Sequence, residues 1–198
     1  MNLANGLTLT RIILAPLFLL LISVPNIYTQ YGALLVFISA CLTDLLDGYI
    51  ARIKNQITNF GKFMDPLADK LLVVMGLVSF AQLSLIPVWV VILIISREIF
   101  ITGVRALCAY KGVFIFPTRL AKAKTATEMA LIIICLLFTT TRTTFASLSA
   151  LDGYWRQDYS LYITKGIFYL SLAALTLALV SGIHYIWKNK ETLWGASP

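Results

Sequence analysis

Long apolar runs separated by short polar segments dominate the pattern of residues along this chain. A run of about 20 apolar residues is long enough to cross the hydrocarbon core of a bilayer as a helix. Backbone polar groups in lipid must be hydrogen-bonded within their own segment, so each run is expected to be helical. The pattern predicts six helical spans, at approximately 8–24, 31–51, 62–82, 86–108, 124–140 and 161–187.

The connections between these spans are short, and no linker, low-complexity tract or internal repeat interrupts them. We therefore expect an all-α, polytopic membrane protein in which residues 1–198 form one six-helix domain. Composition supports this class, because 59% of the residues are hydrophobic and only 13% are charged. A soluble domain is closer to half apolar and about 25% charged, and a soluble chain of this length could not cover so many apolar runs with polar surface.

Basic residues indicate how the chain is oriented, because lysine and arginine concentrate in cytoplasmic segments of membrane proteins. With a cytoplasmic N-terminus, ten basic residues fall on or near the inner side and three on the outer side. The sequence therefore predicts a multi-pass protein with its N-terminus in the cytoplasm. This bias, together with attraction to anionic lipid, accounts for the net charge of +7, and we expect no nucleic-acid partner.

Four aspartates, Asp44, Asp47, Asp65 and Asp69, lie within 26 positions of a chain that has only nine acidic residues. Ionisable groups inside apolar spans are costly and usually mark a functional site. The members of the first pair are three residues apart and those of the second pair four apart, so each pair shares one face of a helix. If the two helices are antiparallel neighbours, all four carboxylates converge near the cytoplasmic interface.

A turn of about ten residues, including Asn55, Asn59 and Gly61, is expected to join these two helices. Gly48 and Gly61 flank the acidic cluster, and a glycine inside a helix costs about 1 kcal/mol relative to alanine. Two explanations remain open for these glycines. They allow either close helix packing or the approach of a ligand's base or phosphates to the backbone.

The acidic cluster predicts a cation site, because four carboxylates repel one another strongly in a low dielectric. Oxygen ligands suit hard cations such as magnesium, manganese or calcium. No histidine or cysteine lies within the cluster, which makes zinc a poorer fit. No Ser–His or Cys–His arrangement, of the kind that activates a nucleophile for a covalent enzyme intermediate, is evident either.

The spacing D-x2-D-G-x2-A-R-x8-G-x3-D-x3-D is present in full from Asp44 to Asp69. It resembles the signature of the CDP-alcohol phosphotransferases. The likeness extends over nearly the whole chain and looks like one branch of that family, the bacterial phosphatidylglycerophosphate synthases. The segments that carry this wider likeness are Met1–Asn5, Gly61–Lys70, Ser96–Glu98, Thr102–Arg105 and Ser181–Ile183.

Two positions depart from the pattern of that branch. Ala121 stands where we expect a glycine before Lys122, and His184 stands where some relatives have a carboxylate. Neither position lies in the signature, so they affect only the expected details of the acceptor pocket.

The resemblance implies transfer of the phosphatidyl group of CDP-diacylglycerol to glycerol 3-phosphate, with release of CMP. It implies that Asp44, Asp47 and Asp65 bind two divalent cations, magnesium or manganese, and that Asp69 completes the second site. It also implies that Asp69 is the general base that acts on the attacking hydroxyl. Carboxylates within hydrogen-bond reach of an alcohol can serve as such bases.

The resemblance further implies that Gly48, Arg52 and Gly61 lie against the cytidine and pyrophosphate of the donor. The acyl chains of the donor would stay in the surrounding membrane lipid. The relatives are dimers, so a homodimer is expected. By the same resemblance, the protein would lie in the bacterial cytoplasmic membrane, with its active site on the cytoplasmic side.

Arg105, Lys122 and Lys124 are the expected ligands of the acceptor phosphate, because they project from the cytoplasmic side between the fourth and fifth spans. Arginine offers bidentate contacts to phosphate and lysine a point charge. The positive-inside bias alone also explains these residues without any ligand. Arg97 and Glu98 lie deeper in the fourth span, where we expect a structural pair rather than a substrate contact.

Two other functions remain open from the sequence. The same chemistry could act on another acceptor, such as inositol phosphate or serine. Alternatively, the carboxylates could line a cation path through the membrane, since acidic residues in spans also occur in transporters. The clustering of the acidic residues near one face, next to two glycines, argues against a transporter.

Overall fold

The computed structural model describes the backbone of residues 3–54, 59–110, 119–147 and 160–190, and the side chains of 6, 8–43, 68, 70–108, 120–147 and 160–190. These ranges contain no strand and form six helices, which confirms the all-α prediction. The helices are α1 (Leu3–Ser23), α2 (Ile27–Lys54), α3 (Asn59–Gln82), α4 (Val88–Tyr110), α5 (Arg119–Ser147) and α7 (Ser160–Lys188).

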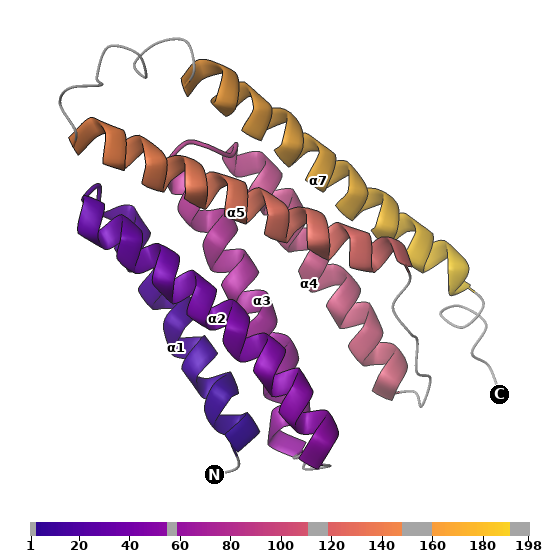
Figure 1. Cartoon of the computed structure of the whole chain (residues 1–198). Helices are drawn as coiled ribbons and strands as arrows, with labels where there is room; N and C mark the ends of the chain where they lie inside the picture. The colour runs from indigo at the N-terminus through magenta and orange to yellow at the C-terminus, as the bar shows by residue number, and fades with distance from the viewer. Residues whose placement is uncertain (1–2, 55–58, 111–118, 148–159, 191–198) are drawn as a thin grey trace.

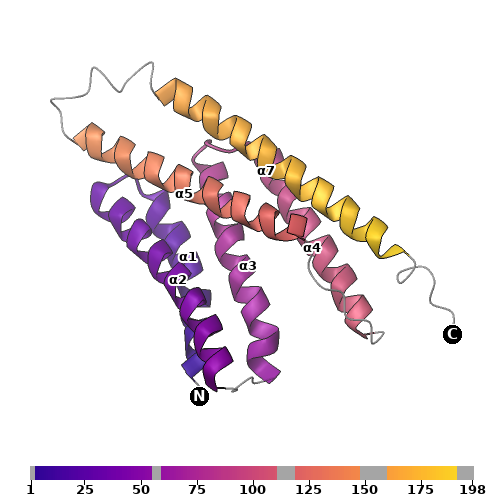
Figure 2. The same ribbon diagram turned by 45° about the vertical axis from the view of Figure 1, so that its right-hand side comes forward.

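The helices form two groups that meet along α5. Helices α1, α2 and α3 lie side by side, while α4 and α7 pack together and α7 also runs along α5 (Figures 1 and 2). Helix α5 crosses α2 and α3 and so connects the groups. The start of α1, the end of α2 and the start of α3 lie together at one end of the molecule.

The turn between α1 and α2 is fixed by polar side chains. Pro25 lies in it, and a proline restricts the preceding residue to non-helical conformations. The side chain of Asn26 caps α2 by accepting a hydrogen bond of 3.0 Å from the backbone N–H of Tyr28. The buried amide of Gln30 donates to the carbonyl of Ile22 at 3.1 Å, which satisfies one of the last carbonyls of α1. These contacts direct α2 back along α1.

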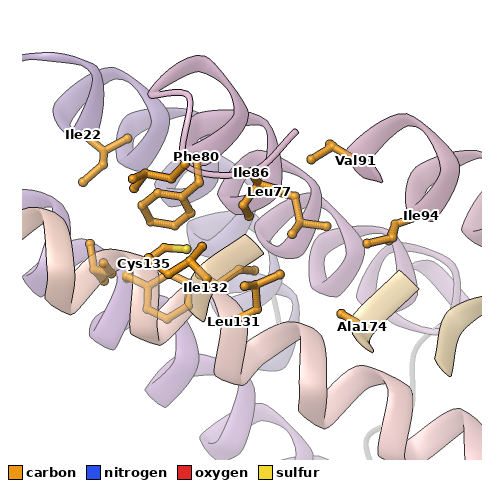
Figure 3. Packing of buried hydrophobic residues seen from close by; sticks show 14 of the residues in the cluster. Ile22, Leu77, Phe80, Ile86, Val91, Ile94, Leu131, Ile132, Cys135 and Ala174 are labelled. Atoms are coloured by element: carbon orange, nitrogen blue, oxygen red, sulfur yellow. The ribbon is translucent and has the colours of Figure 1, made fainter. Parts of the chain in front are cut away.

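One apolar core runs through the bundle and receives side chains from all six helices. The ring of Phe18 on α1 packs against Phe37 on α2 and Phe80 on α3, with centroids 5.5 Å and 6.4 Å apart. Figure 3 shows Leu77 and Phe80 of α3 beside Ile132 and Cys135 of α5. Gly76 on α3 provides room for this contact, because a Cβ there would lie 2.9 Å from Cδ1 of Ile132.

Helix α5 is longer than its predicted span of 124–140, because a threonine-rich segment continues it to Ser147. The hydroxyls of Thr141, Thr143 and Thr144 each donate to a backbone carbonyl four residues earlier, at 2.7–2.9 Å. Since these hydroxyls are satisfied within the helix itself, the polar run does not end it.

Two described helical segments, Leu120–Ser147 and Ser160–Lys188, are long and apolar enough to cross a membrane by length and composition. Shorter apolar segments occur at Thr8–Ser23, Ile27–Thr43 and Lys70–Gln82. Many large apolar side chains are exposed on the outer faces of the helices, including Ile13, Leu35 and Ile183. Exposed apolar surface of this kind marks a membrane or protein contact.

Candidate active site

The structure places the backbone of the acidic cluster on two consecutive helices. Asp44 and Asp47 belong to the last part of α2, and Asp65 and Asp69 to the first part of α3. Their side chains lie outside the described residues, as do those of the other three predicted donor-site residues, Gly48, Arg52 and Gly61.

The connection between α2 and α3 differs from the predicted turn of about ten residues. Helix α2 extends to Lys54 and α3 already begins at Asn59, so Asn59 and Gly61 are helical. Asparagine is favoured at helix starts, and a single glycine is tolerated within a helix at a cost of about 1 kcal/mol. The predicted turn was therefore too long.

The possible metal ligands in this segment suit a hard divalent cation. They are four carboxylates, on two helices that are joined through residues 55–58. Carboxylate oxygens are the ligands that magnesium and manganese prefer. Cation binding here remains a prediction that rests on the sequence pattern and on this helix arrangement.

A second feature is an open cavity of about 430 Å³, lined by residues of α3, α4, α5 and α7. Five basic side chains and one carboxylate line it among the described residues. The basic residues are Lys70, Arg97, Arg105, Lys122 and Lys124, and the carboxylate is Glu98. The three predicted acceptor-phosphate ligands, Arg105, Lys122 and Lys124, therefore line one cavity.

Lys70 connects this cavity with the acidic cluster, because it directly follows Asp69 in α3. Its ammonium group donates to the hydroxyl of Thr102 on α4 and lies 3.8 Å from Oε1 of Glu98. The hydroxyl of Thr102 in turn donates to the backbone carbonyl of Glu98 at 2.7 Å. The cavity therefore adjoins the helix turn that carries the predicted general base.

Glu98 is the centre of an ion-pair network in the cavity wall. Its Oε2 atom accepts hydrogen bonds from Nη1 of Arg97, at 3.0 Å, and from the ammonium group of Lys124. The predicted Arg97–Glu98 pair is thus present. The side chain of Glu98 retains 26% exposure, so it also faces the cavity.

Lys124 is buried, although the sequence places it with the exposed basic residues of the inner side. Only 3% of its surface is exposed, and its ammonium group bridges Glu98 on α4 and Glu128 on its own helix. The distance from Nζ to Oε2 of Glu128 is 2.8 Å. Because two carboxylates hold this lysine, it is part of the packed cavity wall, whereas Lys122 is exposed.

The side chain of Arg97 connects α4 to α7 through hydrogen bonds. Its Nε atom donates to the carbonyl of Ala178 at 2.9 Å, and Nη2 donates to the hydroxyl of Ser181 at 2.7 Å. Gly182 makes room for it, because a Cβ there would lie 3.1 Å from Nε of Arg97. This explains the Ser181–Gly182 pair, which gives both a partner and space to the guanidinium group.

The guanidinium group of Arg105 lies over the ring of Tyr185 on α7, with Cζ 5.7 Å from the ring centroid. This distance is within the range of a cation–π interaction. Tyr185 is only 2% exposed, so its ring is a fixed support. Arg105 itself is exposed and can reach an anion in the cavity.

Two residues of this site received no role from the sequence. Lys70 belongs only to the Gly61–Lys70 segment of the wider likeness, and Glu128 belongs to no motif of the sequence. The spacing of Lys124 and Glu128, four residues apart on one helix face, was the available signal for their pairing. No comparable signal exists for Lys70, because its partners lie on α4.

The family model of the CDP-alcohol phosphatidyltransferases matches residues 1–179 of the chain. The CDP-diacylglycerol–glycerol-3-phosphate 3-phosphatidyltransferase of Bacillus subtilis is 37% identical, and the alignment covers 97% of this chain and 97% of that protein. The protein of the same name from Rickettsia typhi is 38% identical over 69% of this chain and 76% of its own length. A probable phosphatidylglycerophosphate synthase of Mycobacterium tuberculosis is 39% identical over 57% of this chain and 55% of its own length.

Proposed function

Because this chain belongs to the CDP-alcohol phosphatidyltransferase family, we propose that it transfers the phosphatidyl group of CDP-diacylglycerol to glycerol 3-phosphate. The products are phosphatidylglycerophosphate and CMP. The observation that carries this function is the full-length similarity to a relative named for this reaction. The cavity lined by basic side chains next to Asp69 supports an acceptor that carries a phosphate.

The protein acts in the bacterial cytoplasmic membrane, with all six helices as spans and both its N-terminus and active site on the cytoplasmic side. The apolar character of the helices and the distribution of basic residues support this arrangement.

We further propose that the protein is a homodimer. Helix α4 offers a contact surface through the exposed side chains of Trp89, Ile92 and Phe100. Light scattering of the purified protein in detergent would measure the number of copies.

Donor binding is assigned to the segment from Asp44 to Asp69. Magnesium or manganese held by Asp44, Asp47, Asp65 and Asp69 would neutralise charge on the pyrophosphate of the donor. Gly48, Arg52 and Gly61 would then contact the cytidine and pyrophosphate.

Acceptor binding is assigned to the cavity between α3, α4, α5 and α7. Arg105 and Lys122 are the exposed basic residues of its wall, so their side chains are free to contact a phosphate. Lys124 contributes positive charge to the wall from its buried position, where it is already paired with two carboxylates. Its role in acceptor binding is therefore electrostatic.

The reaction proceeds in one step. Asp69 accepts the proton of the acceptor hydroxyl, while the hydroxyl oxygen forms a bond to the phosphorus of the phosphatidyl group. The bond between that phosphorus and the bridging oxygen of the pyrophosphate breaks, and CMP leaves with the bonding electrons. Phosphoryl-type transfers depend mainly on positioning and charge stabilisation, which the cavity and the acidic cluster would supply.

CMP release by the purified protein, given CDP-diacylglycerol and one acceptor at a time, tests this function. We expect release with glycerol 3-phosphate, and its loss when EDTA removes divalent cations. Serine and inositol phosphate serve as comparison acceptors. Release with one of these and none with glycerol 3-phosphate would show that the chemistry is right but the acceptor is wrong.

Arg105→Ala is expected to raise the KM for glycerol 3-phosphate by about 10- to 100-fold, because a hydrogen bond to a charged group contributes about 1.5–3 kcal/mol. Arg105→Lys should recover only part of this loss, because lysine lacks the bidentate geometry of arginine. Arg142→Ala, at an exposed arginine near the other end of α5, is the matched control. An unchanged KM in Arg105→Ala would remove Arg105 from the acceptor site.

A further inference from the structure

Glu98 is the one described carboxylate that lines the cavity, among five basic side chains. A site that bound only phosphate would gain nothing from a carboxylate, because like charges repel. Glu98 therefore either balances the basic side chains as an internal counter-ion or recognises another part of the ligand. The contacts of its two oxygens distinguish these roles.

The two carboxylate oxygens of Glu98 have different surroundings. Oε2 accepts hydrogen bonds from Arg97 and Lys124, which fixes the orientation of the carboxylate. Oε1 forms an ion pair with the ammonium group of Lys70 at 3.8 Å, a distance that is too long for a hydrogen bond. An ionised carboxylate oxygen has two lone-pair sites. Within the part of the chain that the structure describes, Oε1 thus accepts no hydrogen bond, and the contacts of Oε2 hold it in place.

Glu98 also lies in the same cavity wall as the exposed basic residues that are proposed to bind the acceptor phosphate. Arg105 is two helical turns further along α4, about 10 Å along the axis at about 1.5 Å per residue. Lys70, which follows Asp69, faces Glu98 from α3. An acceptor whose phosphate is bound by Arg105 and Lys122 keeps one hydroxyl that neither the phosphate contacts nor the reaction uses, the hydroxyl on its middle carbon. Glu98 is the described carboxylate of this cavity that can accept a hydrogen bond from it.

We infer that Oε1 of Glu98 accepts a hydrogen bond from the non-reacting hydroxyl on the middle carbon of the acceptor. Glu98 then determines specificity for polyol phosphates, in contrast to simple hydroxyalkyl phosphates. This inference rests on the proposed function, because it specifies how the same cavity selects its acceptor.

The test compares glycerol 3-phosphate with 3-hydroxypropyl phosphate, which keeps the phosphate and the reacting hydroxyl but lacks the middle hydroxyl. The wild-type protein should prefer glycerol 3-phosphate by about 10- to 100-fold in kcat/KM, the range expected for a hydrogen bond to a charged group. In Glu98→Gln the preference should fall, and in Glu98→Ala it should disappear. Glutamine keeps the shape of the side chain and a polar oxygen for Arg97 and Lys124.

The ratio of the two kcat/KM values separates recognition from a structural role. If Glu98 only holds Lys124 and Arg97 in place, both acceptors lose activity equally and the ratio stays at its wild-type value, which overturns the inference. Lys122→Met is the control, because loss of a shared phosphate contact should lower both values by the same factor.

The wild-type protein alone can also overturn the inference, even if Glu98→Gln and Glu98→Ala do not fold. Equal kcat/KM for the two acceptors overturns the inference while leaving the proposed function intact. Failure of the wild-type protein to release CMP with glycerol 3-phosphate would instead overturn the proposed function itself.

Discussion

Asp69→Asn is expected to lower turnover by about 100- to 10,000-fold, the range in which a general base contributes. Asparagine has nearly the same shape as aspartate but cannot accept a proton from the acceptor hydroxyl at neutral pH. It keeps one carbonyl oxygen, so cation-dependent binding of the donor should be largely intact. The loss should therefore appear in kcat and hardly in the affinity for CDP-diacylglycerol.

Single-turnover release of CMP and titration of the donor in the presence of magnesium measure these two quantities separately. Asp158→Asn, in the segment between α5 and α7, is the matched control and should leave both unchanged. Turnover of Asp69→Asn near the wild-type rate would exclude Asp69 as the base. A proportional loss of donor binding would identify it mainly as a cation ligand.

Lys124→Met is expected to destabilise the protein by about 3–5 kcal/mol, the cost of breaking a buried ion pair by removing one partner. Glu128 has only 1% of its surface exposed, so its carboxylate would remain buried without its cation. Glu98 would lose the same partner on the cavity side. Thermal unfolding in detergent, followed by circular dichroism, measures the change.

Two further variants make this prediction specific. Lys124→Met combined with Glu128→Gln should recover part of the loss, because the uncompensated carboxylate is also removed. Lys122→Met should change stability by less than about 0.5 kcal/mol, since Lys122 is exposed. Equal stability of Lys122→Met and Lys124→Met would contradict the buried network.

The contrast between Lys122 and Lys124 shows where sequence reasoning reached its limit. The sequence treats them as similar members of one basic segment, and both were predicted as phosphate ligands. On a helix, residues two positions apart point to nearly opposite sides, because successive residues turn by about 100°. One lysine therefore faces outward and the other points into the protein. Which of the two is buried depends on how α5 packs against α4 and α7.

The length of the helices shows a similar limit. The predicted fifth span ends at residue 140, within the threonine-rich run that begins at Thr139, and the predicted second span ends at Ala51, before Arg52 and Lys54. In the structure α5 continues to Ser147 because its threonine hydroxyls bond to its own carbonyls. Polarity marks the end of an apolar run, whereas a helix ends only where its backbone hydrogen bonds do.

The helical class, the approximate position of six helices and the position of the acidic signature could be read from the amino-acid sequence alone. These properties follow from local patterns, namely the length of apolar runs and the spacing of residues along a helix. Which charged residues share a cavity depends on the tertiary fold. Lys70, Glu98, Lys124 and Ser181 come from four different helices, and their meeting depends on how side chains pack over the whole bundle. Packing of this kind is a long-range property that no local spacing encodes.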